Sequence, residues 1–317
     1  DNGYRNYMEL FLPSKKWNKE YIFARNQGTG YSDNIHQEKC MAANGMGGWS
    51  GLCPTQELVD AYEMANGSTP IIGYNADGTP IINGASGYSE TGFAATAGKH
   101  YPAGVYNMYV GREPRFYASI NFNGQQWRGR QLEFWQGGKD GINVSKVDYC
   151  CTGYLLRKTA DEGVDVINGK GGMKEASILF RVGSLYLDYA EALNEAEGPV
   201  DDVYKYVDAI RKRAGLPGLA KGLDKDKMRE RIQHERQIEL AFEAGHRYFD
   251  CHRWKIAEKT DNGYMHGMNI TATNKVDYSK RSTVGDSRVF EKKHYLFPIP
   301  QSEMDKQIGL VQSPYWE

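Results

Sequence analysis

The chain has 317 residues, a mass of 35.8 kDa, and 39 basic against 40 acidic side chains, which gives a formal net charge of −1. This balance offers no support for nucleic-acid binding, because phosphate recognition needs a basic excess or stripe. No apolar run approaches the roughly 20 residues that cross a bilayer. The chain contains 22 Tyr against 11 Phe. Because each buried Tyr hydroxyl needs a partner, this ratio indicates long hydrated loops and an adhesive surface.

Composition divides the chain into two parts that we expect to form one compact unit. Residues 1–170 are predicted to be a loop-rich, ligand-facing subregion with short strands, among them 116–120. Its single predicted helix runs from Pro54 to Met64, since Pro suits a first helical turn and Asn66-Gly67 follows as a stop signal. Further turn signals are Asp77-Gly78, Asn83-Gly84 and Asn123-Gly124.

Residues 171–317 are predicted to be helical, with a tail that returns to the body. Apolar residues recur every three or four positions from 178 to 193 and again from 200 to 210. Gly198-Pro199 separates the two stripes, so they predict a helical hairpin of tetratricopeptide size. A third helix is expected from about Asp224 to Ala244, and a shorter one after Gly245. The aromatic residues of the 312–316 end are expected to pack back onto the body.

The cysteines leave two interpretations open. Cys40, Cys53, Cys150, Cys151 and Cys251 are odd in number and fit no common zinc spacing. In an oxidising compartment Cys40 and Cys53 could bridge the Gly-rich loop between them, or all five thiols could be free.

Three patterns that resemble catalytic or cofactor motifs lack a required part. His234-Glu235 is not followed by a second His one helical turn on, so no zinc site is predicted. The Gly-rich segment 45–51 follows no apolar strand and precedes no Lys-Ser/Thr, which favours a surface loop presenting Trp49 over a phosphate cradle. Acidic residues between 235 and 253 alternate with Arg at ion-pair spacing and predict a structural ladder. Its members are Glu235, Glu239, Glu243, Arg247, Asp250 and Arg253.

Several segments together resemble the SusD/RagB family. Residues 180–195 read FRVGSLYLDYAEALNE, 210–217 read IRKRAGLP, and 235–250 read ERQIELAFEAGHRYFD before Arg253-Trp254. The last segment has Ala244 as an extra residue relative to the family pattern. Segments 54–62, 112–117, 152–158 and 295–300 also fit, so the resemblance extends from about residue 50 to the end.

The resemblance implies a mainly α fold, in which tetratricopeptide-like hairpins of a SusD-like α-α superhelix carry a large loop-rich subregion with short strands. It also implies a nutrient-binding lipoprotein on the outer-membrane surface of Bacteroidetes, which covers a SusC-like TonB-dependent transporter. The lipid anchor and earlier helices are then expected in a portion that precedes this chain. No enzymatic activity, cofactor, metal or nucleic-acid partner is expected.

A glycan is the favoured ligand, with peptide uptake of the RagB kind as the main alternative. A helical-repeat interaction scaffold and a glycoside hydrolase are the other classes considered. Sugar C–H faces pack on aromatic rings, and sugar hydroxyls pair with amides, carboxylates and Arg. Loop aromatics and their polar neighbours are therefore the predicted ligand residues, namely Trp49, Tyr31, Asp33, Asn34, Trp127, Arg128 and Trp135.

Overall fold

The computed structural model describes residues 2–12, 18–26, 31–170, 176–243, 245–306 and 309–316. Its α-helices are α1 (Asn2–Glu9), α2 (Tyr31–Met41), α3 (Gln56–Ala61), α4 (Pro114–Ser119), α5 (Val182–Glu197), α6 (Asp201–Arg213), α7 (Lys225–Glu239), α8 (His246–Arg253), α9 (Ala257–Thr260), α10 (Lys275–Tyr278) and α11 (Gln301–Met304). Three short 3-10 helices are η1 (Asn44–Met46), η2 (Asn107–Tyr109) and η3 (Lys292–Tyr295). The strands are β1 (Tyr21–Asn26), β2 (Ile71–Tyr74), β3 (Pro80–Ile82), β4 (Ile120–Phe122), β5 (Gln126–Trp127), β6 (Arg130–Gln131), β7 (Tyr154–Leu156), β8 (Ala176–Arg181), β9 (Gly263–Met268) and β10 (Arg281–Arg288).

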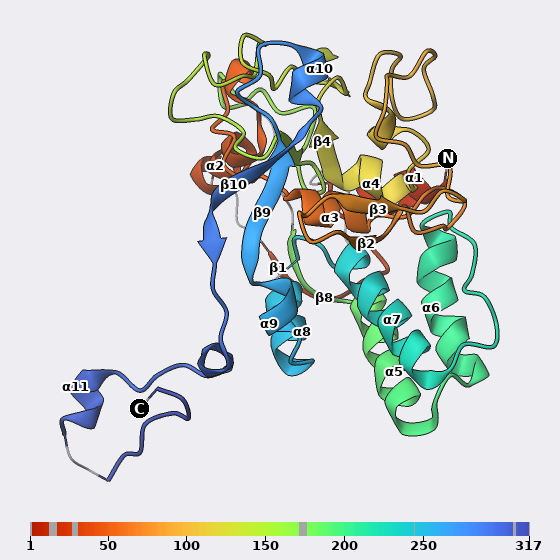
Figure 1. Cartoon of the computed structure of the whole chain (residues 1–317), viewed down its shortest axis with the longest axis vertical. Coiled ribbons are helices and arrows are strands. Elements are labelled where there is room, and N and C mark those ends of the chain that lie inside the picture. The colour runs from red at the N-terminus through yellow and green to blue at the C-terminus, as the bar shows by residue number, and fades with distance from the viewer. Residues whose placement is uncertain are drawn as a thin grey trace.

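Helices α5, α6 and α7 pack side by side and form the lower part of the molecule in Figure 1. Their shared core consists of fully buried apolar side chains, among them Ala190, Val203, Val207, Met228 and Ile232. These positions lie on the two apolar stripes and on the third predicted helix. The predicted helical hairpin is therefore confirmed.

The loop-rich part contains the largest core. Most of its buried residues come from positions 41–160, and Ile238, Met268 and Tyr278 join them from the second half of the chain. The described strands form two-stranded antiparallel sheets, paired β1–β8, β2–β3, β4–β7, β5–β6 and β9–β10. The described chain is thus mainly helical with short sheets, as predicted.

The prediction of a strand at 116–120 is correct only for its last residue, Ile120. Pro114 occupies the start of α4, and Glu113 precedes it in extended conformation as the N-cap residue. Only Ile120 lies in a strand, where β4 pairs with β7 and Ile120 faces Leu156. Adjacent Phe and Tyr side chains favour strands in general, but here the Pro start and the burial of the whole turn favour a helix.

Helix α7 ends at Glu239, five residues before the predicted end. The Glu239 carbonyl oxygen accepts hydrogen bonds from Tyr7 Oη (3.0 Å), Lys158 Nζ (2.9 Å) and Arg181 Nη2 (3.1 Å). Lys158 Nζ also binds the carbonyl oxygen of Ala241 at 2.7 Å. Side chains from distant segments thus satisfy the carbonyls at which the helix stops. Ala244 lies outside the described residues.

The predicted charge ladder is buried and larger than expected. Arg115 contacts Glu113, Glu235 and Glu239 at 2.7, 2.6 and 3.0 Å, and all four side chains are at most 2% exposed. Arg211, Arg181 and Arg213 extend the network to Glu63, Glu243 and Glu20. Asp250 and Arg253 form a neighbouring group with Arg236 and Glu191. Arg247 has no ion pair among the described residues, so its assignment to the ladder is not supported.

The C-terminal segment does not return to the body. In Figure 1 the blue chain after β10 runs outward and carries α11 away from the other helices. Trp316 Nε1 instead donates to the carbonyls of Lys293 (2.8 Å) and Leu296 (3.0 Å) within the same segment. Phe297 and Val311 are 82% and 83% exposed. The tail therefore folds mainly on itself.

Candidate ligand-binding site

Trp49 is exposed, as predicted, but its ring is not isolated. The side chain is 38% exposed and stacks on His36 of α2, with 5.4 Å between ring centroids. Lys39 Nζ lies 5.5 Å from the centroid of the indole ring. Gly48 lets the backbone approach α2 closely, because a Cβ there would lie 2.1 Å from the Ala42 carbonyl oxygen. The loop thus holds Trp49 against a helix rather than leaving it mobile.

Trp127 and Arg128 occupy interior positions, which contradicts their predicted role at a binding surface. Trp127 is 1% exposed within the main core, so neither face of its ring is open to a ligand. The Arg128 side chain is 9% exposed and pairs with Glu38, whose carboxylate oxygen lies 2.9 Å from Nη2. Arg128 Nη2 also donates to the Asp161 carbonyl at 2.8 Å. Burial and ion pairing therefore make both residues structural.

The remaining predicted residues are Trp135 and the three polar or aromatic residues at the start of α2. Trp135 is partly buried and packs on the main core. Tyr31, Asp33 and Asn34 were expected in a polar loop, but their backbone forms the first turn of α2. The side chains of these three residues lie outside the described part of the structure.

A different set of residues surrounds a hollow of about 350 Å³ on the loop-rich part, a volume within the range of small-molecule sites. We call it the aromatic hollow. Its lining residues come from α1, the 98–102 loop, α4, β5 and two connecting segments, and they are Tyr4, Gly98, Lys99, His100, Tyr101, Pro102, Tyr117, Gln125, Gln126 and Arg157.

Four rings of this hollow form a continuous series. His100 stacks on Tyr4 with 4.6 Å between centroids and lies 5.1 Å from Tyr117 on its other side. Tyr101 stacks on Tyr117 at 6.1 Å. Gly98 is required for this arrangement, because a Cβ at that position would lie 2.3 Å from the Tyr101 ring. The 98–101 turn is closed by a 2.9 Å hydrogen bond from Gly98 N to the Tyr101 carbonyl.

Two buried donors of the hollow lack protein partners. Gln125 is 2% exposed, and its Oε1 accepts from Phe122 N at 3.3 Å. Its amide Nε2 and the Nε of Arg157 have no hydrogen-bond partner among the described residues. A buried donor without an acceptor costs free energy. Because the terminal torsion of Gln is broad, its amide can turn toward an acceptor in the hollow.

Trp127 supports the hollow from beneath. The Arg157 guanidinium lies 4.7 Å from the centroid of the Trp127 ring and 5.6 Å from that of Tyr4. Arg157 Nη2 donates to the Tyr4 hydroxyl at 2.6 Å, and Nη1 donates to the Tyr117 carbonyl at 3.0 Å. Burial lowers the pKa of Arg157 from its usual value, yet an Arg remains charged at neutral pH. Trp127 therefore positions a cation at the site without touching the hollow itself.

His100 supplies a neutral ring. Burial lowers its pKa to about 4, and the positive charges of Lys99 and Arg157 act in the same direction. At neutral pH the imidazole is therefore uncharged, with one nitrogen able to donate and one able to accept. A stack of neutral rings beside one guanidinium suits a polar, uncharged ligand with an exposed C–H face.

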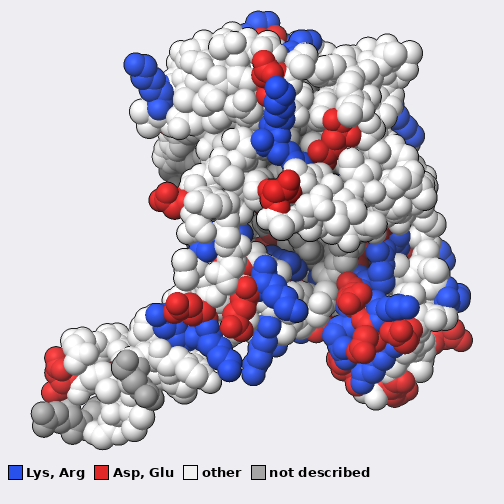
Figure 2. Space-filling view, viewed as in Figure 1, with Lys and Arg blue, Asp and Glu red and all other residues white. Residues whose placement is uncertain are grey.

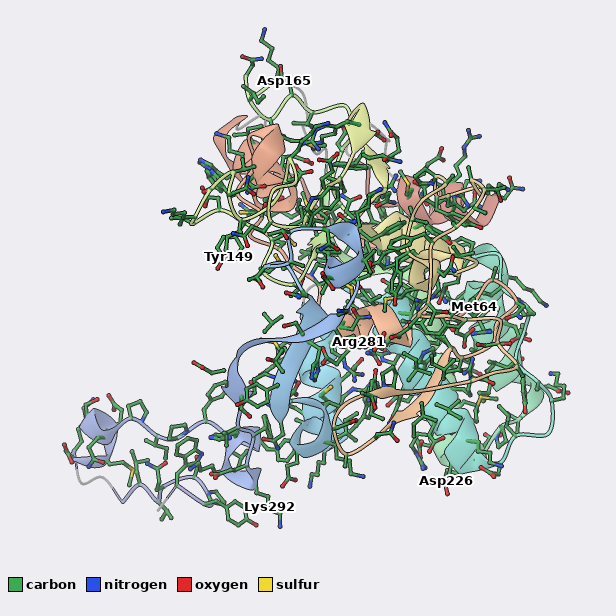
Figure 3. All side chains as sticks on the ribbon, turned by 45° about the horizontal axis from the view of Figure 1, so that its top comes forward. Met64, Tyr149, Asp165, Asp226, Arg281 and Lys292 are labelled. Carbon is green, nitrogen blue, oxygen red and sulfur yellow. The ribbon has the colours of Figure 1, made fainter. Side chains whose placement is uncertain are left out.

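Arg281 links Asp60 of α3 to Glu90, which lies in the segment that precedes the 98–102 loop. In Figure 3 it lies near the middle of the molecule, where β10 passes α3. Its Nη1 binds Asp60 of α3 at 2.7 Å, and its Nε binds Glu90 at 3.1 Å. Glu90 in turn accepts from the Tyr88 hydroxyl at 2.7 Å. The sequence contains no local signal for this role, because the partners lie 221 and 191 residues away.

A second cavity, of about 520 Å³, lies between α3, α8 and β9. Arg247, Phe242 and Tyr264 line it together with polar side chains of the 259–262 segment. Phe242 has a φ of 64°, which is an uncommon backbone conformation for a bulky residue. This cavity combines aromatic and charged groups, but no unpartnered buried donor has been found in its lining among the described residues. We therefore favour the aromatic hollow as the candidate site.

The described residues contain neither a group of three His, Cys, Asp or Glu side chains arranged for a metal ion nor a helix long and apolar enough to cross a membrane. Charges of both signs cover the lower helices in Figure 2, where Arg229 pairs with Glu195 and Asp226, and the loop-rich part above is mostly uncharged. The visible face thus shows no basic stripe of the kind that nucleic-acid binding needs.

The SusD family model matches residues 14–316. This chain belongs to the SusD family. This membership is consistent with the prediction that the chain is not an enzyme. The motifs that suggested the family in the sequence are those of the α5–α8 helices and the segments around α3, α4 and β7.

Individual relatives agree with this assignment. SusD-like protein P25 of Formosa agariphila is 42% identical over 82 residues, which are 25% of this chain and 15% of that protein. SusD-like protein P2 of the same organism is 29% identical over 154 residues, or 45% and 26% of the two chains. A solved SusD-like protein from Bacteroides fragilis is 28% identical with a TM-score of 0.72, over 99% of this chain and 57% of that one.

A second solved protein from Bacteroides fragilis, described as a SusD-like carbohydrate-binding protein, shares the fold. Its TM-score is 0.67 at 24% identity, over 94% of this chain and 56% of that chain. The present chain therefore spans little more than half the length of these solved relatives and less of the curated ones.

Proposed function

We propose that this chain is part of a cell-surface glycan-binding protein that delivers its ligand to a SusC-like TonB-dependent transporter. In this proposal the full-length protein is held at the outer membrane by a lipid anchor outside this chain. Family membership supports the proposal, as does the description of a fold relative as carbohydrate-binding. The peptide-binding and interaction-scaffold alternatives then become outcomes of the binding experiments.

The aromatic hollow is the proposed sugar site. The observation that carries this assignment is the combination of stacked neutral rings with a buried amide donor that has no partner among the residues that the structure describes. A pyranose would place its C–H face on Tyr101 and His100, while its hydroxyl oxygens accept from Gln125 and Arg157. The hollow needs neither a nucleophile nor a metal for this purpose.

The first prediction concerns Tyr101→Ala. Loss of this partly buried ring, which lines the hollow, should weaken oligosaccharide binding by about 1–3 kcal/mol, by analogy with stacking of other planar ligands on aromatic residues. The measurement is calorimetric titration of the chain with a panel of oligosaccharides, followed by titration of the variant with the tightest binder.

Trp49→Ala is the matched control, because Trp49 is an exposed ring that the sequence favours as a ligand residue and it stacks on His36 outside the hollow. Unchanged binding in Tyr101→Ala with loss in Trp49→Ala would move the site to the 45–51 loop. Binding of peptides but of no oligosaccharide would replace the glycan proposal by the peptide alternative.

The transporter and the location require the full-length protein. Co-purification of a TonB-dependent transporter with it, and its digestion by protease added to intact cells, are the expected results. A full-length protein that stays protected in intact cells and purifies alone would contradict this part of the proposal without affecting sugar binding.

A further inference from the structure

Three cysteines from two distant segments meet beside α3. Cys53 immediately precedes Pro54 at the start of this region, and Cys150 and Cys151 follow Tyr149, which Figure 3 labels. The Cys53 and Cys150 sulfur atoms are 3.8 Å apart, although 97 residues separate them in sequence. Cys151 follows Cys150 directly in the chain, and its interaction with Cys53 together with its burial raises the pKa of the Cys151 thiol.

The three thiols differ in accessibility. Cys150 is 3% exposed, Cys53 is partly buried, and Cys151 is exposed. The Cys150 sulfur lies 2.9 Å from the Tyr154 carbonyl oxygen, to which its proton is donated, so its lone pairs are free to face Cys53. Exposure thus decreases from Cys151 through Cys53 to Cys150, and an external reagent reaches Cys151 first.

The backbone already holds the two segments together. Leu156 N donates to the Leu52 carbonyl at 2.9 Å, next to Cys53 in sequence. A disulfide bond is about 2.05 Å long, so the 3.8 Å pair must approach by less than 2 Å. Formation of the bond thus needs a small adjustment of side chains and no rearrangement of the sheet formed by β4 and β7.

We propose that Cys53, Cys150 and Cys151 form a thiol–disulfide relay whose product is a Cys53–Cys150 disulfide. The oxidant is a small disulfide such as oxidised glutathione. The exposed Cys151 thiol gives up its proton to the solvent as its sulfur attacks one sulfur of this disulfide, so that a mixed disulfide forms and one glutathione is released as a thiol. Cys53 then attacks the Cys151 sulfur and releases the second glutathione thiol.

Exchange within the cluster completes the relay. Cys150 attacks the Cys53 sulfur, the Cys53–Cys150 bond forms, and Cys151 leaves as a thiolate that takes up a proton. In total two protein thiols lose two electrons and two protons, and one glutathione disulfide is reduced to two thiols. The closed loop joins the segment before α3 to the turn before β7, across the main core.

Thiol counting and peptide mapping test the product. After equilibration with oxidised glutathione, the chain should lose two of its five thiols, and chymotrypsin, which cuts after Trp49 and Tyr149, should release a peptide pair joining Cys53 to the Cys150-Cys151 segment. The disulfide should raise the melting temperature by about 5 °C or more, because it closes a long loop of the unfolded chain. A link between Cys53 and Cys40, or a free Cys53, would overturn the proposal.

Three single variants test the relay order. Cys53→Ser should stop at the mixed disulfide between Cys151 and glutathione and so lose one of its four thiols, and Cys150→Ser should stop at a Cys53–Cys151 disulfide. Cys151→Ser should still form the final bond, but at least tenfold more slowly, because the exposed entry thiol is missing. Cys40→Ser is the matched control and should oxidise like the unmodified chain. Equal oxidation rates in Cys151→Ser and the unmodified chain would exclude the relay.

Discussion

At the residue scale, Glu239 is a buried carboxylate on which three guanidinium groups converge. Its carboxylate is fully buried and lies 3.0 Å from Arg115 and 2.9 Å from Arg181, with Arg213 also bound. Burial alone raises the pKa of Glu239, but Arg213, Arg181 and Arg115 outweigh that effect and hold the pKa well below its usual range. The side chain is therefore an anion at neutral pH.

Replacement of Glu239 by Gln should strongly destabilise the fold. The substitution keeps the shape but leaves three guanidinium groups without their common anion, and removal of one partner from a buried ion pair costs about 3–5 kcal/mol. Urea denaturation of the two proteins measures the difference in free energy of unfolding.

Arg247→Ala is the control for this experiment. Arg247 has no ion pair among the described residues and lines the second cavity, so its removal should change the free energy of unfolding by less than about 1 kcal/mol. A loss as large as that of Glu239→Gln would restore Arg247 to the ladder in which the sequence placed it.

His100 should titrate far below an ordinary histidine. Because burial is the main cause of its lowered pKa, with Lys99 and Arg157 adding to it, the midpoint should lie near pH 4. The unfolded chain binds this proton first as pH falls, so the contribution of His100 to stability is complete above about pH 6.5. That contribution declines as pH falls from there toward 4. An NMR titration of the His100 ring protons measures the midpoint directly, and a midpoint near 6.5 would show an open, hydrated ring.

At the scale of elements, apolar periodicity located the helices whose stability comes from one buried face. α5 and α6 match the predicted stripes because Ala190, Val203 and Val207 face one core. Ile178 continues the α5 stripe in sequence, but it lies in β8, where it pairs with Ala24 of β1. The spacing of apolar residues at 178–193 fits a helix throughout. It carries no information about β1, the distant strand that forms hydrogen bonds with β8.

Elements held by long-range contacts could not be located in this way. The end of α7 depends on side chains from residues 7, 158 and 181. The aromatic hollow was missed for the same reason, since Tyr4 and Arg157 are 153 residues apart. Loop composition correctly indicated that Trp49 is exposed. It could not show that Trp127, which lies in a similar polar segment, is buried in the core.

At the scale of the whole molecule, the body and the tail differ in how their apolar residues are covered. The body encloses Trp127, Phe116 and Phe122 in one continuous core. The tail beyond η3 instead leaves Phe297 and Val311 largely exposed and forms its hydrogen bonds internally, as between Gln312 and Ile299 at 2.7 and 2.9 Å. The stability of the body should therefore not depend on the tail.

Deletion of residues 297–317 tests this separation. The truncated chain should keep its melting temperature within about 2 °C, since a shift of that size corresponds to less than about 1 kcal/mol for a protein of this size. It should also keep its oligosaccharide affinity, because the aromatic hollow contains no residue beyond Arg157. Differential scanning calorimetry and the same ligand titration measure the two quantities. A fall of 5 °C or more would indicate that the tail packs on the body in solution, as the sequence predicted. In that case the aromatic side chains of the tail would be buried against the body.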